Sequence, residues 1–308
     1  MRLARLAMKR LACLYAIVGA VALAAVSFGA EGTTRVLIVT GGHAFEEGPF
    51  FQLFRDNPDI AFVAAEHDGA SATAWERDDL ATFDAVVLYD MPRSITPAQQ
   101  GKMRSLFERG AGLLVLHHAL VSFQDWPDYE RIIGGRYPQP PAGQPQVSDA
   151  VGYQHDVDVP VTILDTRHPI TAGMKDFTIR DEIYWGFRVG GDVHPLLGTT
   201  HPKAGKPLMW TRTEGKSRVV FLQLGHDRQA FDNPNFRDLV ARSIRWAARR
   251  SGGTMTPRMA TCGTFSVVGV ASRIGRGSES PELSARICIS RFDNIGRGAT
   301  ARADSGRP

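Results

Sequence analysis

The stretch GLLVLHH, residues 112–118, indicates the fold class of this 308-residue protein. Its aliphatic residues form a short apolar run, which is typical of a strand buried on both faces of a parallel sheet. Comparable runs stand at RVLIVT (35–40), IAFVAAE (60–66) and DAVVLYD (84–90), with room for helices between them. The alternation of strands and helices predicts βαβ units, in which a mainly parallel sheet carries helices on both faces.

The rest of residues 31–250 extends this α/β pattern less regularly. Proline at the first helical position, in Thr96-Pro97, predicts a helix that runs to about Arg109. The other predicted elements are a helix near 49–55, a proline-rich loop at 138–146, an edge or antiparallel strand at 156–164, strands of the parallel rhythm at 207–212 and 218–224, and an amphipathic helix at 236–250. Together they predict one large domain over residues 34–250.

The two ends of the chain differ from this domain in composition. Residues 1–30 begin with basic side chains, continue with an apolar run from Leu11 to Val26 and end with small residues, which is the layout of a signal peptide. The run is shorter than the roughly 20 residues that span a membrane, so we expect cleavage and export, to the periplasm or the extracellular space. In the alternative, an uncleaved leader is the protein's membrane contact. Residues 251–308 are rich in Ser, Gly, Arg and Ala without sustained periodicity, which predicts a disordered tail.

Charge and cysteine content exclude several classes of function. The formal net charge is +4, but residues 1–30 and 251–308 each contribute +4, so residues 31–250 carry −4. This mildly acidic domain has no basic stripe with interleaved aromatic side chains, so we expect no nucleic-acid partner. The cysteines of the chain, Cys13, Cys262 and Cys288, lie outside residues 31–250, so the domain has no thiol nucleophile and no thiolate metal ligand. The sequence is compatible with a homo-oligomer and does not fix the oligomeric state.

Polar side chains follow the carboxyl ends of the predicted strands. These positions are Gly41-Gly42-His43, Asp90, His117-His118 and Gly225-His226-Asp227. In an open parallel sheet, ligands bind in the crevice beyond those ends, so we expect these side chains to converge on one site. In the alternative, each histidine only satisfies buried backbone groups. Surface or turn roles are expected for the histidines that stand in turns and loops, namely His67, His168, His194 and His201.

A second group of polar and aromatic residues stands at IRDEIYWGF, residues 179–187. Carboxylates beside aromatic rings are common in sugar sites, where rings stack on pyranose faces and carboxylates accept hydrogen bonds from hydroxyls or transfer protons. The alternative is a buried aromatic hairpin in which Asp181 caps a turn. FEEGPF, residues 45–50, is either a lid over the site or a helix start with acids at its positive end. The candidate substrate-binding residues are therefore His43, Phe45, Asp90, Glu182, Tyr184 and Trp185.

Several of these stretches resemble the ThuA-like, or trehalose-utilisation, domain family. The matching segments, among them TGGHAFEEGPFF and GAGLLVLHHAL, lie at 40–51, 110–120, 126–137, 167–187, 207–212 and 218–249. The resemblance implies a three-layer α/β domain that is flavodoxin-like, of the class I glutamine amidotransferase type, with a mainly parallel sheet. It also implies a role in carbohydrate catabolism, often beside sugar oxidoreductases that produce keto-sugars.

The resemblance also places two of the candidate groups. In true glutamine amidotransferases a nucleophilic cysteine occupies the turn after a central strand, and a histidine with a nearby acid follows a later strand. Here His117-His118 holds the first position, and Gly225-His226-Asp227 resembles the second. Without the thiol no thioester can form, so we expect no glutaminase activity.

The expected function is therefore catabolism of trehalose or a related glycoside or keto-glycoside, by a hydrolase, lyase or isomerase. We expect His118 and His226 to form the acid/base pair, with Asp227 orienting His226, because imidazole titrates near neutral pH. Glu182 and Tyr184 are expected to bind hydroxyls. His117 is a further catalytic candidate, but we expect its neighbour His118 to be the one that faces His226.

Two further expectations concern a cofactor and the rival functions. Convergent histidines can hold a divalent metal ion such as zinc, and the candidates for ligands are His43, His118 and His226. The rivals to an enzyme are a non-catalytic carbohydrate-binding module and a protein-interaction module on the same scaffold.

Overall fold

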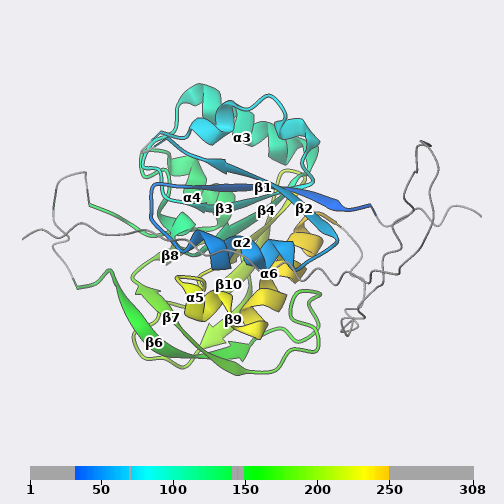
Figure 1. Ribbon diagram of the computed structural model, residues 1–308. Coiled ribbons are helices and arrows are strands. Elements are labelled where there is room, and N and C mark those ends of the chain that lie inside the picture. Colours follow the sequence, from blue (N-terminus) through cyan, green and yellow to red (C-terminus); the bar gives the residue numbers. More distant parts are fainter. Residues whose placement is uncertain (1–31, 69–70, 141–143, 145–148, 250–308) are drawn as a thin grey trace, which may run out of the picture. The chain divides into compact units, whose positions relative to one another are not determined.

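The computed structural model describes residues 32–68, 71–140, 144 and 149–249, all of which belong to one compact unit of the chain (Figure 1). The predicted signal peptide at 1–30 and the predicted tail at 251–308 lie outside the described residues. None of the described helices has both the length and the apolar character that crossing a membrane requires.

A nine-stranded sheet forms the centre of this unit, with the strand order β2-β1-β3-β4-β11-β10-β9-β6-β7. Neighbouring strands are parallel from β2 to β11 and antiparallel from β11 to β7. In chain order the strands are β1 (Thr34–Gly41), β2 (Ile60–Glu66), β3 (Ala85–Asp90), β4 (Gly112–Leu116), β6 (Gly152–Ile163), β7 (Phe177–Trp185), β9 (His194–Thr199), β10 (Met209–Glu214) and β11 (Ser217–Leu222). A separate pair joins β5 (Gly135–Arg136) to β8 (Arg188–Val189).

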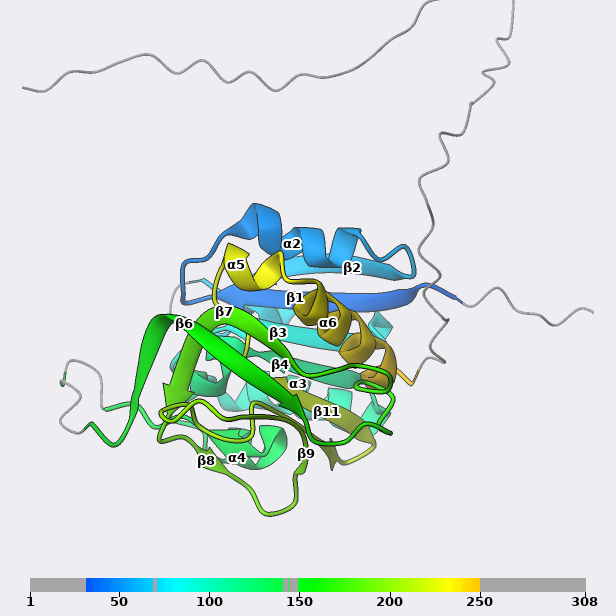
Figure 2. The same cartoon turned by 90° about the horizontal axis from the view of Figure 1, so that it is seen from below.

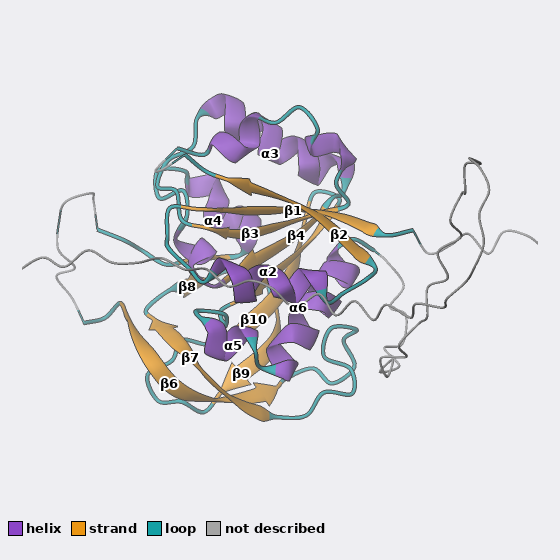
Figure 3. Cartoon of the chain, viewed as in Figure 1, coloured by secondary structure: helices purple, strands orange, loops and turns teal. Residues whose placement is uncertain are grey.

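Helices cover both faces of the parallel half of the sheet (Figure 3). One face carries α3 (Pro97–Arg109) and α4 (Pro127–Ile133), and the other carries α2 (Glu47–Arg55) and α6 (Pro234–Ala247) (Figures 1 and 2). The run of strand β1 is apolar throughout because both of its faces are buried. Val36 and Ile38 belong to one buried cluster, Leu37 and Val39 to the other, because successive side chains point to opposite faces. The predicted three-layer α/β class is confirmed.

The helix predicted after Thr96 forms with a complete set of end signals. The Thr96 side chain accepts a hydrogen bond from the Gln99 backbone, and the Gln99 side chain accepts one from the Thr96 backbone, which makes a capping box with proline next to it. Gly110 ends the helix in the left-handed conformation, at φ 92°. Local sequence therefore fixes this element at both ends.

Strand β10 departs from the parallel rhythm that its sequence predicts. It pairs antiparallel with β11, with Glu214 opposite Ser217. Two residues, Gly215 and Lys216, separate these partners, and Gly215 has a φ of 56°. A two-residue turn can join only antiparallel neighbours, because a parallel pair needs a crossover of a dozen or more residues. The segment at 156–164 is antiparallel as predicted, but β7 rather than β6 is the outermost strand.

This topology places the candidate residues. The parallel strands β1, β3, β4 and β11 deliver the turns that follow them to one edge of the sheet. The antiparallel strands β6 and β7 lie beyond β9, yet helix α5 (Arg228–Phe231), directly after the β11 turn, contacts β7. Side chains from two halves of the sheet therefore meet at the turn after β11.

Candidate functional site

His117 stands where β4 ends and a 3-10 helix, His117–Val121, begins. Its φ is 52°, in the left-handed region that residues other than glycine seldom adopt. Such strained backbone tends to occur at functional sites, where the surrounding structure holds it in place. The His117 ring is buried, and its Nδ1 donates a hydrogen bond to the Gln223 carbonyl oxygen at 2.7 Å. The other nitrogen, Nε2, is therefore the one left for the site.

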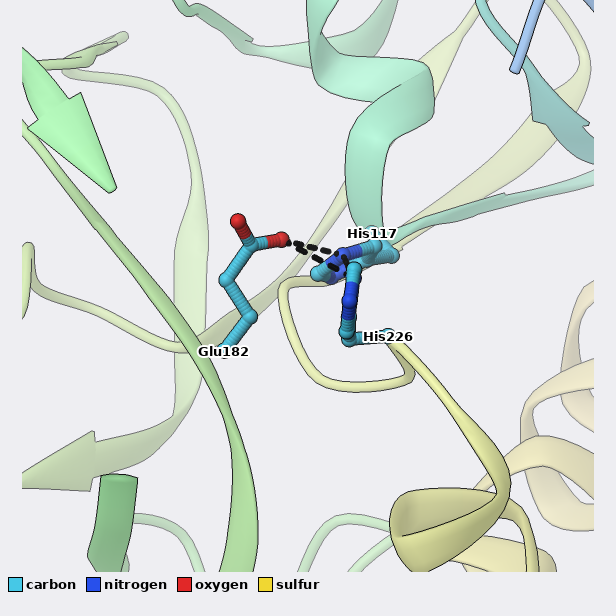
Figure 4. A group of neighbouring side chains, drawn as sticks. All are labelled: His117, Glu182 and His226. Atoms are coloured by element: carbon cyan, nitrogen blue, oxygen red, sulfur yellow. Dashed lines mark hydrogen bonds and ion pairs between the residues drawn. The ribbon is translucent and has the colours of Figure 1, made fainter. Parts of the chain in front are cut away.

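Glu182 of β7 and His226 after β11 meet His117 at this nitrogen (Figure 4). The Glu182 Oε2 lies 2.8 Å from His117 Nε2 and 3.2 Å from His226 Nδ1, and the two imidazole nitrogens are 3.3 Å apart. The Tyr184 hydroxyl lies 2.9 Å from the same His117 nitrogen. We call His117, Glu182 and His226 the central triad.

Asp181, next to Glu182, holds the turn that carries His226. Its two carboxylate oxygens accept hydrogen bonds from the backbone N–H groups of Gly225, at 2.7 Å, and His226, at 2.9 Å. The side chain is buried, and burial raises its pKa, although these hydrogen bonds and nearby His117 act in the opposite direction. Asp181 therefore caps a turn, as in one of the two alternatives drawn from the sequence, and this turn belongs to the site.

His155 adds a third imidazole to Glu182 on the solvent side. Its Nδ1 lies 3.5 Å from the Glu182 Oε1, and its ring centre is 4.5 Å from that of His226. The pairing of β6 with β7 shifts register between Gln154 and Val157, and a bulge of this kind redirects side chains next to a site. The sequence-based prediction did not include His155; the available signal was the polar pair His155-Asp156, which interrupts the alternation of a strand.

A cavity of about 580 Å³ opens beside Glu182 and His155. Four aromatic side chains, Tyr137, Tyr153, Tyr184 and Trp185, contribute to its wall. The Trp185 indole is fixed by a hydrogen bond from Nε1 to the Asp149 carbonyl oxygen, and Tyr153 is 58% exposed. The remaining lining residues are His43, Met91, His118, Val121, Gln139, Pro140, Asp149, Val151 and Gly152. Its size and mixed aromatic and polar lining suit a small polar molecule.

Charge in the central triad is concentrated on Glu182. Burial raises the pKa of this carboxyl, but hydrogen bonds from His117 and His226 outweigh burial and hold the pKa well below its usual range. The hydrogen bond to Glu182 in turn raises the pKa of His226. Glu182 is thus a carboxylate at neutral pH, and the buried His117 and the half-buried His226 both contact it.

His118 does not face His226, so that prediction is wrong and His117 takes the position. The physical reason is the left-handed backbone at His117. In this conformation the His117 side chain points toward β7, and the His118 side chain points toward His43 and Tyr89. The His118 ring stacks on His43, with centres 4.6 Å apart, and lies against Tyr89. Neither of its nitrogens has a hydrogen-bond partner among the described residues. Burial lowers the pKa of His118 well below its usual value, and the neighbouring His117 and His43 lower it further.

Three other predicted site residues lie away from the central triad. Asp227 caps α5 by accepting a hydrogen bond from the Gln229 N–H, so Glu182 rather than Asp227 orients the His226 ring. Phe45 packs on Phe50 and Tyr89, with ring centres 5.1 and 5.3 Å away.

Asp90, the third, is buried and bonded to His67 at 2.9 Å, and it is not among the described residues that line the cavity. His67 does not lie at the surface, because its ring is buried beside Asp90, but it accepts a hydrogen bond from the Ala74 N–H of the 3-10 helix that follows it.

Comparison with known proteins agrees with this architecture. The sequence matches the ThuA family, which is described as trehalose utilisation, over residues 35–247. The chain belongs to the ThuA family.

Two solved ThuA-like proteins share the fold. One from Parabacteroides merdae superposes with a TM-score of 0.63 at 18% identity, covering 73% of this chain and 93% of its own. One from Bacteroides uniformis gives a TM-score of 0.52 at 20% identity, covering 72% and 94% respectively. No curated protein matches the chain in sequence. The family places this ThuA chain in a role related to trehalose utilisation.

Proposed function

We propose that this ThuA chain acts on a keto-glycoside derived from trehalose or a related glycoside, by removing a proton next to the ketone. The observation that carries the proposal is the position of Glu182, a buried carboxylate contacted by three imidazoles at the wall of an aromatic-lined cavity. Aromatic rings suit the apolar faces of a pyranose, and imidazoles suit proton transfer near neutral pH. Membership of a trehalose-utilisation family supports a sugar substrate.

The proposed chemistry divides between the exposed and the buried imidazoles. His155, about half exposed at the cavity, removes the proton from C2 of a 3-keto-glycoside, and the electron pair passes to the ketone oxygen. The imidazoles of His117 and His226, beside Glu182, stabilise the negative charge on that oxygen by hydrogen bonding. When the enolate collapses, a C1–C2 double bond forms, the C1–O bond breaks, and the departing oxygen takes a proton. Reprotonation at carbon before the bond breaks gives isomerisation instead.

Glutamine-dependent ammonia transfer is not expected. By the resemblance to glutamine amidotransferases, His117-His118 holds the position of the nucleophile, and residues 31–250 contain no cysteine. Imidazole cannot form the thioester on which that reaction depends.

We propose that the protein works outside the cytoplasm. The support is the order of basic, apolar and small residues within positions 1–30, which is the layout of a signal peptide. Fractionation of the native host, with detection of the mature N-terminus by mass spectrometry, tests this. A protein that stays in the cytoplasm with residues 1–30 intact contradicts the proposal.

The activity is tested by incubating the full chain with trehalose, 3-keto-trehalose and related 3-keto-glycosides in D2O, followed by proton NMR. We expect consumption of a keto-glycoside together with loss of the C2 proton signal, and no consumption of the parent glycoside. His155→Gln should slow both events, whereas His194→Gln, a matched change at an exposed histidine paired with Asp165, should not. Absence of exchange and of consumption across the panel overturns the proposal.

A non-catalytic carbohydrate-binding module is the rival function. The exposed Tyr153 at the cavity favours it, because a rim aromatic can bind a sugar without any chemistry. His226→Ala separates the two. Retained sugar binding with lost turnover supports the enzyme, and binding without turnover in the unmodified chain supports the module.

A further inference from the structure

We infer that His117, Glu182 and His226 form a binding site for one divalent transition-metal ion, with His117 Nε2, Glu182 Oε2 and His226 Nδ1 as its ligands. These three atoms lie within 4.8 Å of one another and come from three separate elements (Figure 4). The binding of the ion stands on this geometry alone, and its chemical role rests on the proposed function. The inferred set keeps His226 from the sequence-based candidates and replaces His43 and His118 by His117 and Glu182.

The dimensions of the triad suit such an ion. The three ligand atoms are 2.8, 3.2 and 3.3 Å apart, and a triangle with these sides has its centre about 1.8 Å from each corner. Zinc binds imidazole nitrogen and carboxylate oxygen at about 2.0–2.2 Å. An ion at that distance from all three atoms lies about 1 Å off their plane, without any movement of the side chains. The three ligands then occupy one side of the ion and leave other coordination positions open.

Hydrogen bonding around His117 gives an independent argument. Its Nδ1 must carry a hydrogen, because its partner at Gln223 is a carbonyl oxygen, which can only accept. Nε2 then meets Glu182 Oε2, His226 Nδ1 and the Tyr184 hydroxyl, although one ring nitrogen offers a single in-plane site. A cation between His117 Nε2, Glu182 Oε2 and His226 Nδ1 satisfies these three ligand atoms simultaneously, and the Tyr184 hydroxyl is then free to pair with another acceptor. Donation of the second ring nitrogen to a backbone carbonyl is also the usual arrangement in histidines that bind metals.

The residues around His226 and Glu182 also hold these two ligands in place. Asp181 fixes the backbone of the His226 turn through two hydrogen bonds, and Glu182 is 4% exposed on strand β7. Supporting contacts of this kind hold ligands in position before an ion arrives. Two imidazoles and one carboxylate suit zinc and other first-row divalent ions, whereas magnesium and calcium prefer oxygen ligands.

The ion would assist the proposed proton removal. Glu182 and His155 both line the cavity, which places the inferred ion next to the space that a substrate would occupy. A bound divalent ion polarises a carbonyl and stabilises the enolate oxygen that forms when the neighbouring proton leaves. His117 and His226 would then hold the ion, and His155, which is outside the ligand set, would carry the proton.

Isothermal titration with Zn²⁺ tests the site. The full chain is purified without a histidine tag, stripped with a chelator and titrated, and one high-affinity ion per chain is expected. Glu182→Gln and His226→Gln should each weaken binding by more than the roughly 10–100-fold that a supporting residue contributes. His43→Gln is the matched control, because His43 lines the same cavity without belonging to the triad, and its affinity should stay within about threefold. Circular dichroism checks that each variant is folded.

Two results overturn the site: no stoichiometric Zn²⁺ binding by the full chain, or binding that both triad substitutions leave unchanged. Turnover of a keto-glycoside by the stripped chain that Zn²⁺ does not increase contradicts the role of the ion while the proposed function stands. Tight Zn²⁺ binding without turnover of any keto-glycoside has the opposite meaning, because the metal site then stands and the proposed function fails.

Discussion

Two histidine–carboxylate groups, one fully buried and one with a half-buried histidine, stand at the same edge of the sheet, and they differ in how their hydrogen bonds are completed. In the pair His67–Asp90, the histidine accepts from the Ala74 N–H and donates to Asp90, which also lies within 3.3 Å of the Ser122 hydroxyl. Every ring nitrogen has one partner, so the pair is closed. In the central triad, three polar atoms crowd one nitrogen of His117 beside a cavity, so the group is open.

We expect this difference to separate a structural role from a functional one. Both groups pair histidine with a carboxylate, and their residues are buried except for the half-buried His226. In a closed pair every polar atom already has a hydrogen-bond partner, so none is available to bind a ligand. In an open group a ligand or a proton can still supply the missing partner. We therefore expect substitutions in the closed pair to affect stability and substitutions in the open group to affect activity.

The largest effect is expected for Glu182→Gln, which removes the charge of the open group while keeping its shape. Because this carboxylate connects all three imidazoles, kcat/KM for the keto-glycoside should fall by about 100-fold or more. Steady-state kinetics measures the loss, and the melting temperature serves as control. A variant with normal kcat/KM would mean that the open group has no catalytic role.

Asp90→Ala is the reciprocal test on the closed pair. It leaves a buried His67 N–H without its acceptor, so the free energy of unfolding should fall by about 3 kcal/mol. Chemical denaturation measures this loss. Well below the melting temperature, kcat/KM should match that of the unmodified chain. A folded Asp90→Ala protein without activity would instead support the sequence-based prediction that Asp90 binds substrate.

The contrast also explains how far the sequence could lead. The apolar strand runs, the capped helix after Thr96 and the turns at the strand ends are local features, so the fold class and the edge that carries the site were predictable. The choice between His117 and His118 was not, because it depends on a left-handed φ that the packed turn imposes.

Two further residues show the same limit. His155 reaches Glu182 only because a bulge shifts the register of β6 against β7, and neither strand's sequence reveals that pairing. Asp227 is adjacent to His226 in the chain, which made it the expected orienting acid, but helix α5 uses it as a cap. Its place is taken by Glu182, which lies 44 residues before His226 in the sequence and is brought in by the antiparallel half of the sheet.

Asp181→Asn should have an intermediate effect, because Asp181 acts on the open group through the backbone. The amide keeps one acceptor oxygen but places an NH2 group against a second backbone N–H, so the Gly225-His226 turn loses one hydrogen bond. We expect kcat/KM to fall by about tenfold, with Zn²⁺ affinity falling in parallel. Equal losses in Asp181→Asn and Glu182→Gln would show that the two acids are not distinct in role.

The smallest effect is expected at His118, which is neither closed nor open. Its ring is buried without a hydrogen-bond partner among the described residues, so His118→Phe should be neutral or stabilise the fold by about 1 kcal/mol at pH 7.5. The sign of the pH dependence follows from its lowered pKa. Below about pH 6.5, His118 binds a proton in the unfolded chain but not in the folded chain. The free energy of unfolding therefore falls as the pH drops.

The phenylalanine variant lacks this proton, so its stability advantage should grow below pH 6.5, by up to about tenfold in the unfolding constant per pH unit. Urea denaturation of both proteins between pH 5 and 8, with a chelator present, measures the difference and cancels the contribution of every other histidine. A constant difference across this range would mean that His118 takes up its proton in the folded chain. The ring would then have a partner, and it would belong with the closed pair rather than between the two groups.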